Sequence, residues 1–182
     1  MKKIIITIVA ITVLGGIGYY LYDKSIPQKV VLDSFEGEIT KETVDFGAAK
    51  GSSLSVSAAD DAACGEQALQ LDYTLKPSGY MWAARGFGLD VAGAAAWQVQ
   101  PSEVVWGKYQ ALRVAMKGSG SKAVIAFDIK DSGGEIWRFL LDDDSREWKE
   151  VICPFAEFFP RSDWQPETAE NNEVLDFPLM SF

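Results

Sequence analysis

Histidine is absent from the 182-residue sequence. Its absence excludes Ser-His-Asp and Cys-His catalysis, as well as zinc or iron sites built on imidazole. Two carboxylates could still hydrolyse a glycoside, and Glu36, Asp128 and Glu135 are available for that chemistry. However, no acidic pair lies in a recognisable glycosidase motif. We therefore expect a protein that is not an enzyme.

Basic runs are missing as well. The chain has 17 Lys and Arg residues against 26 Asp and Glu, which gives a net charge of −9. Proteins that bind nucleic acid need clustered positive side chains to neutralise the phosphate backbone. An acidic chain without such a cluster predicts that nucleic acid is not a partner.

Cysteine is scarce, with only Cys64 and Cys153 in the chain. An oxidising compartment would permit a disulfide between them. Cys153, however, lies on the alternating apolar face of a predicted strand, whereas Cys64 lies in a loop beside Gly65. This placement favours two unlinked thiols over a disulfide.

One long uncharged run is present, at residues 4–22, directly after two lysines. As a helix it would span about 28 Å, enough to cross a bilayer. It could be a cleaved signal peptide. The missing Ala-x-Ala cleavage site and the tyrosines near its end favour an uncleaved membrane anchor. Either interpretation predicts that residues 1–27 target an extracytoplasmic domain formed by residues 28–182.

Helical periodicity is also lacking in this domain. Short segments separated by Gly, Ser, Asp or Pro turns show the period-2 alternation of strands. The predicted strands are residues 31–37, 52–58, 67–75, 80–88, 111–118, 123–131, 136–142, 148–155 and 175–182. Many short antiparallel strands predict an all-β sandwich or jelly roll, preceded by one N-terminal hydrophobic helix.

Four motifs along residues 31–182 carry a resemblance. They are LDSFEG, then GEQALQLDYTL, then YQALRVAMKGSG followed by DIKDSGGEIW, and finally REWKEVICPFAEFF. The chain resembles the jelly-roll carbohydrate-binding domains of the galactose-binding-like superfamily. It is most similar to the family 11 carbohydrate-binding module and to its complex I intermediate-associated relatives. The resemblance implies a non-catalytic antiparallel β-sandwich with a polysaccharide or other glycan as its partner.

Three charged residues, Arg113, Asp128 and Arg138, stand in the middle of predicted strands, between apolar residues. If the three strands are neighbours, alternation places these side chains together on one face outside the core. In sugar-binding jelly rolls such a face is concave and also carries an aromatic ring, which Tyr80 or Trp82 could supply. The alternative is a solvated ladder of ion pairs that contributes little. Alternation alone leaves both interpretations open.

The resemblance also implies a structural calcium ion. Its ligands would include an acidic residue near the first strand, here Asp33 or Glu36, and an Asp of the closing strand. In such domains further strands follow a stretch like residues 175–182, which end this sequence. Either the closing strands are missing because the sequence is a fragment, or a protein partner covers the open sheet edge. The alternative is that this domain closes differently. The acidic run Asp142–Asp144 could also bind a metal ion. We expect these side chains instead to accept hydrogen bonds from backbone amides of their turn.

Two functions follow from these observations. The first is a non-catalytic carbohydrate-binding module at the cell envelope, membrane-anchored or secreted, that holds glycan on a concave sheet face. The alternative is an envelope assembly or scaffolding β-sandwich that binds protein. Loss of glycan binding in Arg138→Ala would support the first, whereas a protein partner insensitive to Arg113 and Arg138 would support the second.

Overall fold

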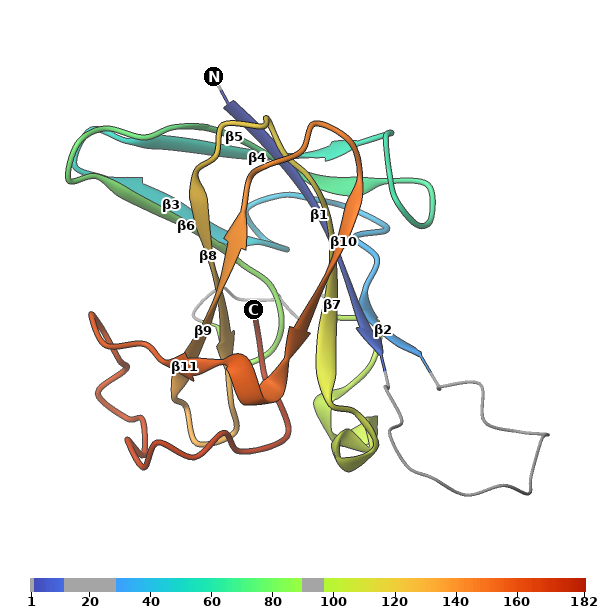
Figure 1. Ribbon diagram of the computed structural model, residues 1–182, viewed down its shortest axis with the longest axis vertical. Coiled ribbons are helices and arrows are strands. Elements are labelled where there is room, and N and C mark those ends of the chain that lie inside the picture. Colours follow the sequence, from blue (N-terminus) through green and yellow to red (C-terminus); the bar gives the residue numbers. More distant parts are fainter. Residues whose placement is uncertain (1, 12–28, 90–96) are drawn as a thin grey trace.

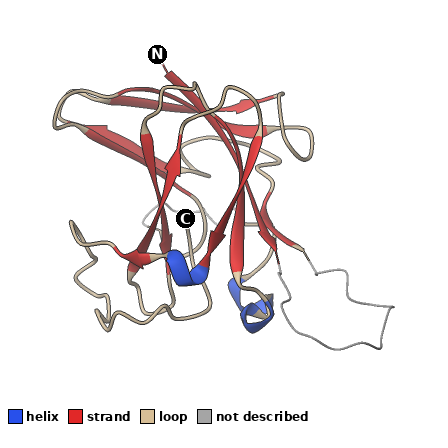
Figure 2. Ribbon diagram, in the orientation of Figure 1, coloured by secondary structure: helices blue, strands red, loops and turns tan. Residues whose placement is uncertain are grey.

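Strands form almost all of the regular structure (Figures 1 and 2). The computed structural model describes residues 2–11, 29–89 and 97–182. Helical segments within these residues are single 3₁₀ turns, namely η1 (Pro101–Glu103), η2 (Trp106–Lys108) and η3 (Phe155–Glu157). In the described part of the chain, no helix has the length and apolar character needed to cross a bilayer. The predicted all-β fold is confirmed.

The strands lie in two layers that face each other (Figure 1). The first layer has the order β10 (Lys149–Pro154), β7 (Ala111–Lys117), β1 (Lys2–Ile11), β5 (Ala68–Thr74) and β4 (Ser53–Ala59), and β2 (Val30–Asp33) pairs with β1. The second layer contains two ladders: β3 (Asp45–Ala49) with β6 (Tyr80–Ala84), and β11 (Phe159–Pro160) with β9 (Ile136–Asp142) and β8 (Val124–Lys130). All of these pairings are antiparallel.

The core lies between the two layers and follows from the period-2 alternation of the strands. Its buried side chains include Leu112, Val114 and Met116 of β7, Phe127 and Ile129 of β8, and Trp137 and Leu141 of β9. Removing apolar surface from water, worth roughly 25 cal/mol per Å², is the main stabilising term for such a sandwich. Because these residues point inward, the charged residues between them must point out of the sandwich.

The last residues of the chain join the two ladders of the second layer. Ser181 forms antiparallel bridges to Gly86, which follows β6, and to Lys130 at the end of β8. Arg85 and Phe182 exchange both backbone hydrogen bonds, at 2.8 and 3.0 Å. Since β6 and β8 are both antiparallel to this segment, they run parallel to each other on its two sides. In Figure 1 the carboxyl terminus lies near the middle of the view.

The predicted N-terminal helix differs from what the structure describes. Lys2–Ile11 is strand β1, placed between β5 and β7. Residues 12–22, the rest of the predicted anchor, lie outside the described residues. The sequence of β1 is rich in Ile, Val and Thr, whose branched side chains favour extended backbone. The same apolar run resembles half of a membrane helix, so hydrophobicity alone does not separate the two.

Eight of the nine predicted strands overlap observed ones, from β2 to β10. The ninth, residues 175–182, forms only the bridges at Ser181. Two short strands were not predicted. β3 has the sequence DFGAA, whose Gly and Ala are poor strand formers, and β11 is only two residues long.

Both cysteines are free, so the prediction of two unlinked thiols is confirmed. Cys153 is buried in the core and Cys64 is exposed. Burial raises the pKa of the Cys153 thiol to about 12. The thiol therefore stays protonated, and Cys153 serves as a small apolar core residue.

Candidate functional site

The outer face of the second layer carries four of the five residues predicted to bind ligand. Tyr80 and Trp82 alternate with inward residues of β6 and are 53% and 45% exposed. Asp128 of β8 lies directly opposite Arg138 of β9 in the ladder. Their neighbours along both strands are buried or packed against the core, so both side chains point outward.

A network of four charged side chains covers the β8–β9–β11 end of this face. Arg138 donates from Nε and Nη2 to both carboxylate oxygens of Asp128, at 2.7 and 2.8 Å. Arg161, just after β11, makes a second bidentate pair with Asp163, with both bonds at 2.9 Å. The two pairs are cross-linked, because Arg138 also reaches Asp163 at 3.3 Å and Arg161 reaches Asp128 at 3.4 Å. We call these four residues the charged cluster.

The charged cluster combines two arginines with two aspartates, so its formal charges balance. Hydrogen bonds from Arg161 lower the pKa of Asp163 to about 2. The hydrogen bond to Asp128 raises the pKa of Arg138 above its ordinary value. Two guanidinium groups and two carboxylates therefore hold one another in place without net charge. Each Nη carries a second N–H, so Arg138 keeps donors that can bond to a ligand.

Tyr80 and Trp82 form the other half of the face, which we call the aromatic pair. Their rings stack with centroids 6.0 Å apart and planes inclined by 27°. The indole of Trp82 lies across β3, so close that a Cβ on Gly47 would come within 2.5 Å of two ring carbons. Trp82 also donates from Nε1 to Asp45, at 3.4 Å. Gly47 thus provides the space in which the indole lies against the sheet.

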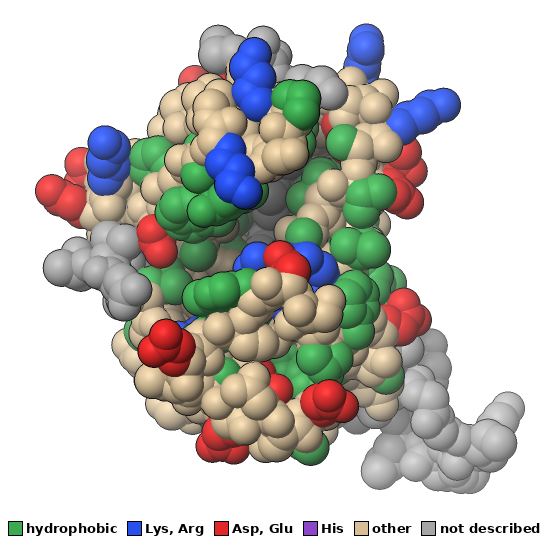
Figure 3. Space-filling view, turned by 90° about the vertical axis from the view of Figure 1, so that its left-hand side faces the viewer, with side chains coloured by type: hydrophobic (Ala, Val, Ile, Leu, Met, Phe, Trp, Pro, Cys, Tyr) green, Lys and Arg blue, Asp and Glu red, His purple; other side chains and the backbone are tan. Residues whose placement is uncertain are grey.

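A hollow crosses the molecule on the side that carries these strands (Figure 3). Hydrophobic and basic side chains border it in this view. β6 and β8 are separated by two strand spacings, about 10 Å, at the level where Ser181 pairs with both. The aromatic pair on β6 and the charged cluster on β8 and β9 therefore belong to opposite sides of one gap. Such a face offers ring surface and hydrogen-bonding groups together.

Arg113 does not join this face, and the expectation that its strand neighbours β8 is wrong. β7 pairs with β10 and β1 in the first layer. There Arg113 donates from Nη1 to both oxygens of Glu150, at 2.9 and 3.0 Å, on the opposite side of the sandwich. The reason is topological. The segment between β7 and β8 crosses from one layer to the other instead of forming a hairpin.

The calcium ligands implied by the resemblance do not fit a metal. Asp33 is buried, and its two carboxylate oxygens accept hydrogen bonds from Nε and Nη2 of Arg85, at 2.6 and 3.2 Å. Burial raises the pKa of Asp33 and outweighs the lowering effect of this pair. A carboxylate that already forms an ion pair with a buried guanidinium is poorly available to bind a cation.

Glu36 is engaged elsewhere. Its Oε1 accepts the backbone N–H groups of Glu66, at 2.8 Å, and Gln67, at 3.4 Å. The side-chain amide of Gln67 donates to the carbonyls of Phe35 and Gly37, the groups nearest to Glu36 in the chain. Within the described residues there is no group of three or more potential metal-binding side chains. Asp33 and Glu36 thus connect loops of the protein.

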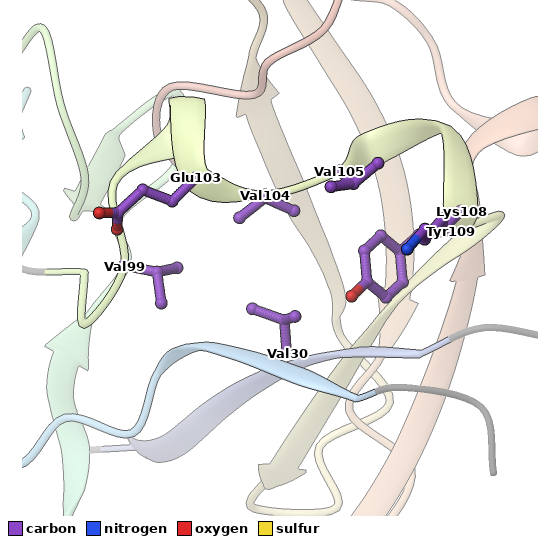
Figure 4. Close-up of a pocket in the computed structure, with 7 residues that line it drawn as sticks. All are labelled: Val30, Val99, Glu103, Val104, Val105, Lys108 and Tyr109. Carbon is purple, nitrogen blue, oxygen red and sulfur yellow. The ribbon is translucent and has the colours of Figure 1, made fainter. Parts of the chain in front are cut away.

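Two pockets lie away from this face. One, of about 190 Å³, lies between β2 and the segment that contains η1 and η2 (Figure 4). Its lining is mostly valine, with Tyr109 at one end and the Glu103 carboxylate turned aside. The other lies on the outside of β7 and β10, beside Trp148. Its lining combines three alanines with Trp148, Lys149 and Glu150.

Sequence reasoning missed part of the site. Arg161, Asp163 and Trp164 follow β11 in an irregular segment, where no periodicity predicts the direction of a side chain. In the structure, the guanidinium of Arg161 lies 5.4 Å from the centre of the Trp164 ring. Trp164 is 55% exposed, and Phe159, opposite Arg138, is 45% exposed. These rings extend the apolar surface beside the charged cluster.

Comparisons with known proteins agree with this fold. Residues 24–181 match the sequence model of a family described as carbohydrate binding domain (family 11). A family 11 module from Clostridium thermocellum, solved in complex with a β-1,3-1,4-mixed-linked tetrasaccharide, superposes with a TM-score of 0.60 and 24% identity, covering 82% of this chain and 81% of that one. The family 11 module of the cellulosomal cellulase Lic26A-Cel5E of C. thermocellum superposes with a TM-score of 0.59 and 22% identity. The match covers 82% of this chain and 79% of that one. The search of curated proteins gives no match.

Proposed function

The chain belongs to the family 11 carbohydrate-binding domains, and we propose that it binds a polysaccharide across the outer face of its second layer. One observation carries this proposal. Exposed rings on β6 and a network of guanidinium and carboxylate groups on β8 and β9 lie on the same outer face. As the first ligand to test we choose a mixed-linkage β-glucan, because a related module was solved with such a tetrasaccharide.

The two halves of the face suit the two sides of a sugar ring. The C–H face of a pyranose stacks on an aromatic ring, which Trp82 and Tyr80 provide. The hydroxyl groups around its edge donate to the carboxylate of Asp128 and accept from Arg138. Since the charged cluster is already fixed by its own ion pairs, little side-chain entropy is lost when the glycan binds.

The proposed module binds its glycan without cleaving it. Glycoside hydrolysis needs one carboxylic acid whose pKa is raised so that it can donate a proton. In the charged cluster the pKa of Asp163 is lowered to about 2, the opposite direction. We place the module outside the cytoplasm, where a binder of polysaccharide meets its ligand.

Electrophoresis in gels that contain soluble mixed-linkage β-glucan tests the proposal. We expect the glucan to retard the protein. Arg138→Ala removes a donor and leaves Asp128 with one weaker partner, and Trp82→Ala removes the stacking ring, so each should reduce the retardation at least fivefold. Each lost contact corresponds to about 1–1.5 kcal/mol, close to a tenfold change in affinity.

Arg113→Ala is the matched control, because Arg113 is also paired to a carboxylate, on the opposite layer. It should leave the retardation unchanged. A domain that migrates freely through a broad panel of soluble glycans would contradict the proposal. So would a loss of retardation as large in Arg113→Ala as in Arg138→Ala.

A further inference from the structure

A small pocket lies between β2 and the segment that contains η1 and η2, away from the proposed glycan face (Figure 4). Its volume is about 190 Å³, and four valines form most of its walls. Val104 is buried, Val30 and Val99 are half-buried, and Val105 is exposed at the mouth. We call the space bounded by these valines and Tyr109 the valine pocket.

The hydroxyl group of Tyr109 points into the valine pocket without a partner. Tyr109 is only 7% exposed, and in Figure 4 its phenolic oxygen is directed toward the space between the valines. No hydrogen bond joins this oxygen to any residue that the structure describes. A buried tyrosine hydroxyl usually has a partner, because burial without one costs free energy. The valine pocket therefore offers one unused donor and acceptor to a ligand.

Hydrogen bonds hold the walls of the valine pocket in place. The backbone N–H of Gln98 donates to the carbonyl of Leu32, at 2.8 Å, and so fixes the chain before η1 to β2. The indole Nε1 of Trp106 donates to the carbonyl of Pro101, at 2.9 Å, across the turn from η1 to η2. The cavity is thus formed before a ligand arrives, and binding need not order these segments.

The composition of the walls restricts the ligand. The carboxylate of Glu103 is turned aside and accepts the backbone N–H of Gln100, at 3.1 Å. Lys108 is exposed, so water screens its charge. A sugar does not fit either, because most of its hydroxyl groups would lose water and meet only methyl groups. The walls suit a ligand with an apolar body and a single hydroxyl group.

We propose that the valine pocket binds a small neutral molecule with one six-membered apolar ring and one hydroxyl group. Its ring lies among the valines, and its hydroxyl pairs with that of Tyr109. The size agrees, because an apolar cavity of about 150 Å³ holds benzene. The valine pocket, at about 190 Å³, leaves room for the ring and small substituents. The proposal does not depend on glycan binding, which uses a different face.

Titration of the ¹⁵N-labelled protein with para-cresol, followed by nuclear magnetic resonance, tests the proposal. We expect the amide signals of Val104, Val105 and Tyr109 to shift along one saturation curve. Toluene differs from para-cresol only in lacking the hydroxyl, and para-toluate carries a carboxylate in its place. Each should bind about fivefold or more weakly than para-cresol, because each loses the neutral hydroxyl that pairs with Tyr109.

Two matched substitutions examine the role of the hydroxyl. Tyr109→Phe removes it and keeps the ring, so para-cresol should bind about five- to tenfold more weakly and toluene equally well. Tyr73→Phe is the control, because Tyr73 is 6% exposed and hence similarly buried. Tyr73 lies opposite Lys2 of β1, whereas Val30 lies opposite Ala10, about 26 Å farther along that strand. The control should bind para-cresol like the parent protein.

Val99→Phe gives a second test that does not rely on Tyr109. Its ring occupies the valine pocket and should abolish the binding of para-cresol and toluene, while circular dichroism and glucan retardation stay unchanged. Four outcomes would overturn the proposal: no saturable shift with para-cresol, equal affinity for toluene, tighter binding of para-toluate, or unchanged affinity in Tyr109→Phe. Saturable binding of para-cresol that weakens in Tyr109→Phe and not in Tyr73→Phe supports it.

Discussion

Replacing Asp143 with asparagine tests how the turn between the two layers is held. The side chain of Asp143 is fully buried, and the turn after β7 surrounds it with hydrogen-bond donors. Its carboxylate accepts the N–H groups of Ser119, Gly120 and Ser121 at 2.8–3.2 Å and the hydroxyls of Ser119 and Ser121 at 2.7 and 2.6 Å. This turn carries the chain from the first layer to the second, where Asp128 joins the charged cluster.

The size of the effect follows from the pKa of Asp143. Burial alone would raise it, but the hydrogen bonds from Ser121, Ser119 and the backbone lower it from 3.8 to about 2. This difference corresponds to about 2 kcal/mol of stability at neutral pH. Asparagine also turns an N–H₂ group toward those donors, so we expect Asp143→Asn to cost about 2–4 kcal/mol and to lower Tm by about 5–12 °C.

The pH dependence of the loss provides the sharper test. Because the folded-state pKa lies below 3.8, the stabilisation by Asp143 is complete above about pH 5 and is lost as the pH falls toward 2. Urea unfolding of the parent and Asp143→Asn should therefore give free energies that converge over this range. Asp142→Asn, an exposed neighbour, is the control and should change little. A difference that stays constant between pH 6 and pH 2.5 would refute the reasoning.

Three further predictions concern the site and the sheet. Gly47→Ala should displace the Trp82 ring, because the ring leaves no space for a Cβ at this position. Glucan retardation should weaken several-fold, while Tm changes by only a few degrees. Unchanged retardation would contradict the placement of the ring. Deletion of residues 2–11 removes β1 from between β5 and β7 and should lower Tm by more than about 10 °C. An equally stable deletion variant would show that β1 is not needed in the sheet. Millimolar calcium or EDTA should shift Tm by less than about 1 °C, because Arg85 already neutralises Asp33; a clear calcium-dependent rise would contradict this.

The local part of the site could be predicted from the sequence. Alternation with buried neighbours set the outward direction of Asp128, Arg138, Tyr80 and Trp82, because a strand allows only two directions for a side chain. It could not tell which strands are neighbours. Arg113 has the same pattern as Asp128, yet β7 belongs to the other layer, and only the crossover between β7 and β8 decides this.

Two other features left no usable pattern in the sequence. Arg161 and Asp163 lie in an irregular segment, where ion pairing rather than periodicity sets their position. The uncharged run at the amino terminus fits a membrane helix by its hydrophobicity, and its Ile, Val and Thr residues also fit a strand, so the pattern did not separate the two. For Asp33 the carboxylate was visible in the sequence, but its partner Arg85 is 52 residues away, and only the fold brings the two together.

Nuclear magnetic resonance of the ¹⁵N-labelled protein, titrated with a mixed-linkage tetrasaccharide, tests the central claim most directly. The indole N–H of Trp82 and the Nε–H of Arg138 should shift together along one saturation curve. The indole signals of Trp106, which is buried, and of Trp148, on the opposite layer, should stay in place. Shifts that centre on Trp148, or no saturable shift at Trp82 and Arg138 with any soluble glycan, would contradict a glycan-binding face on the second layer.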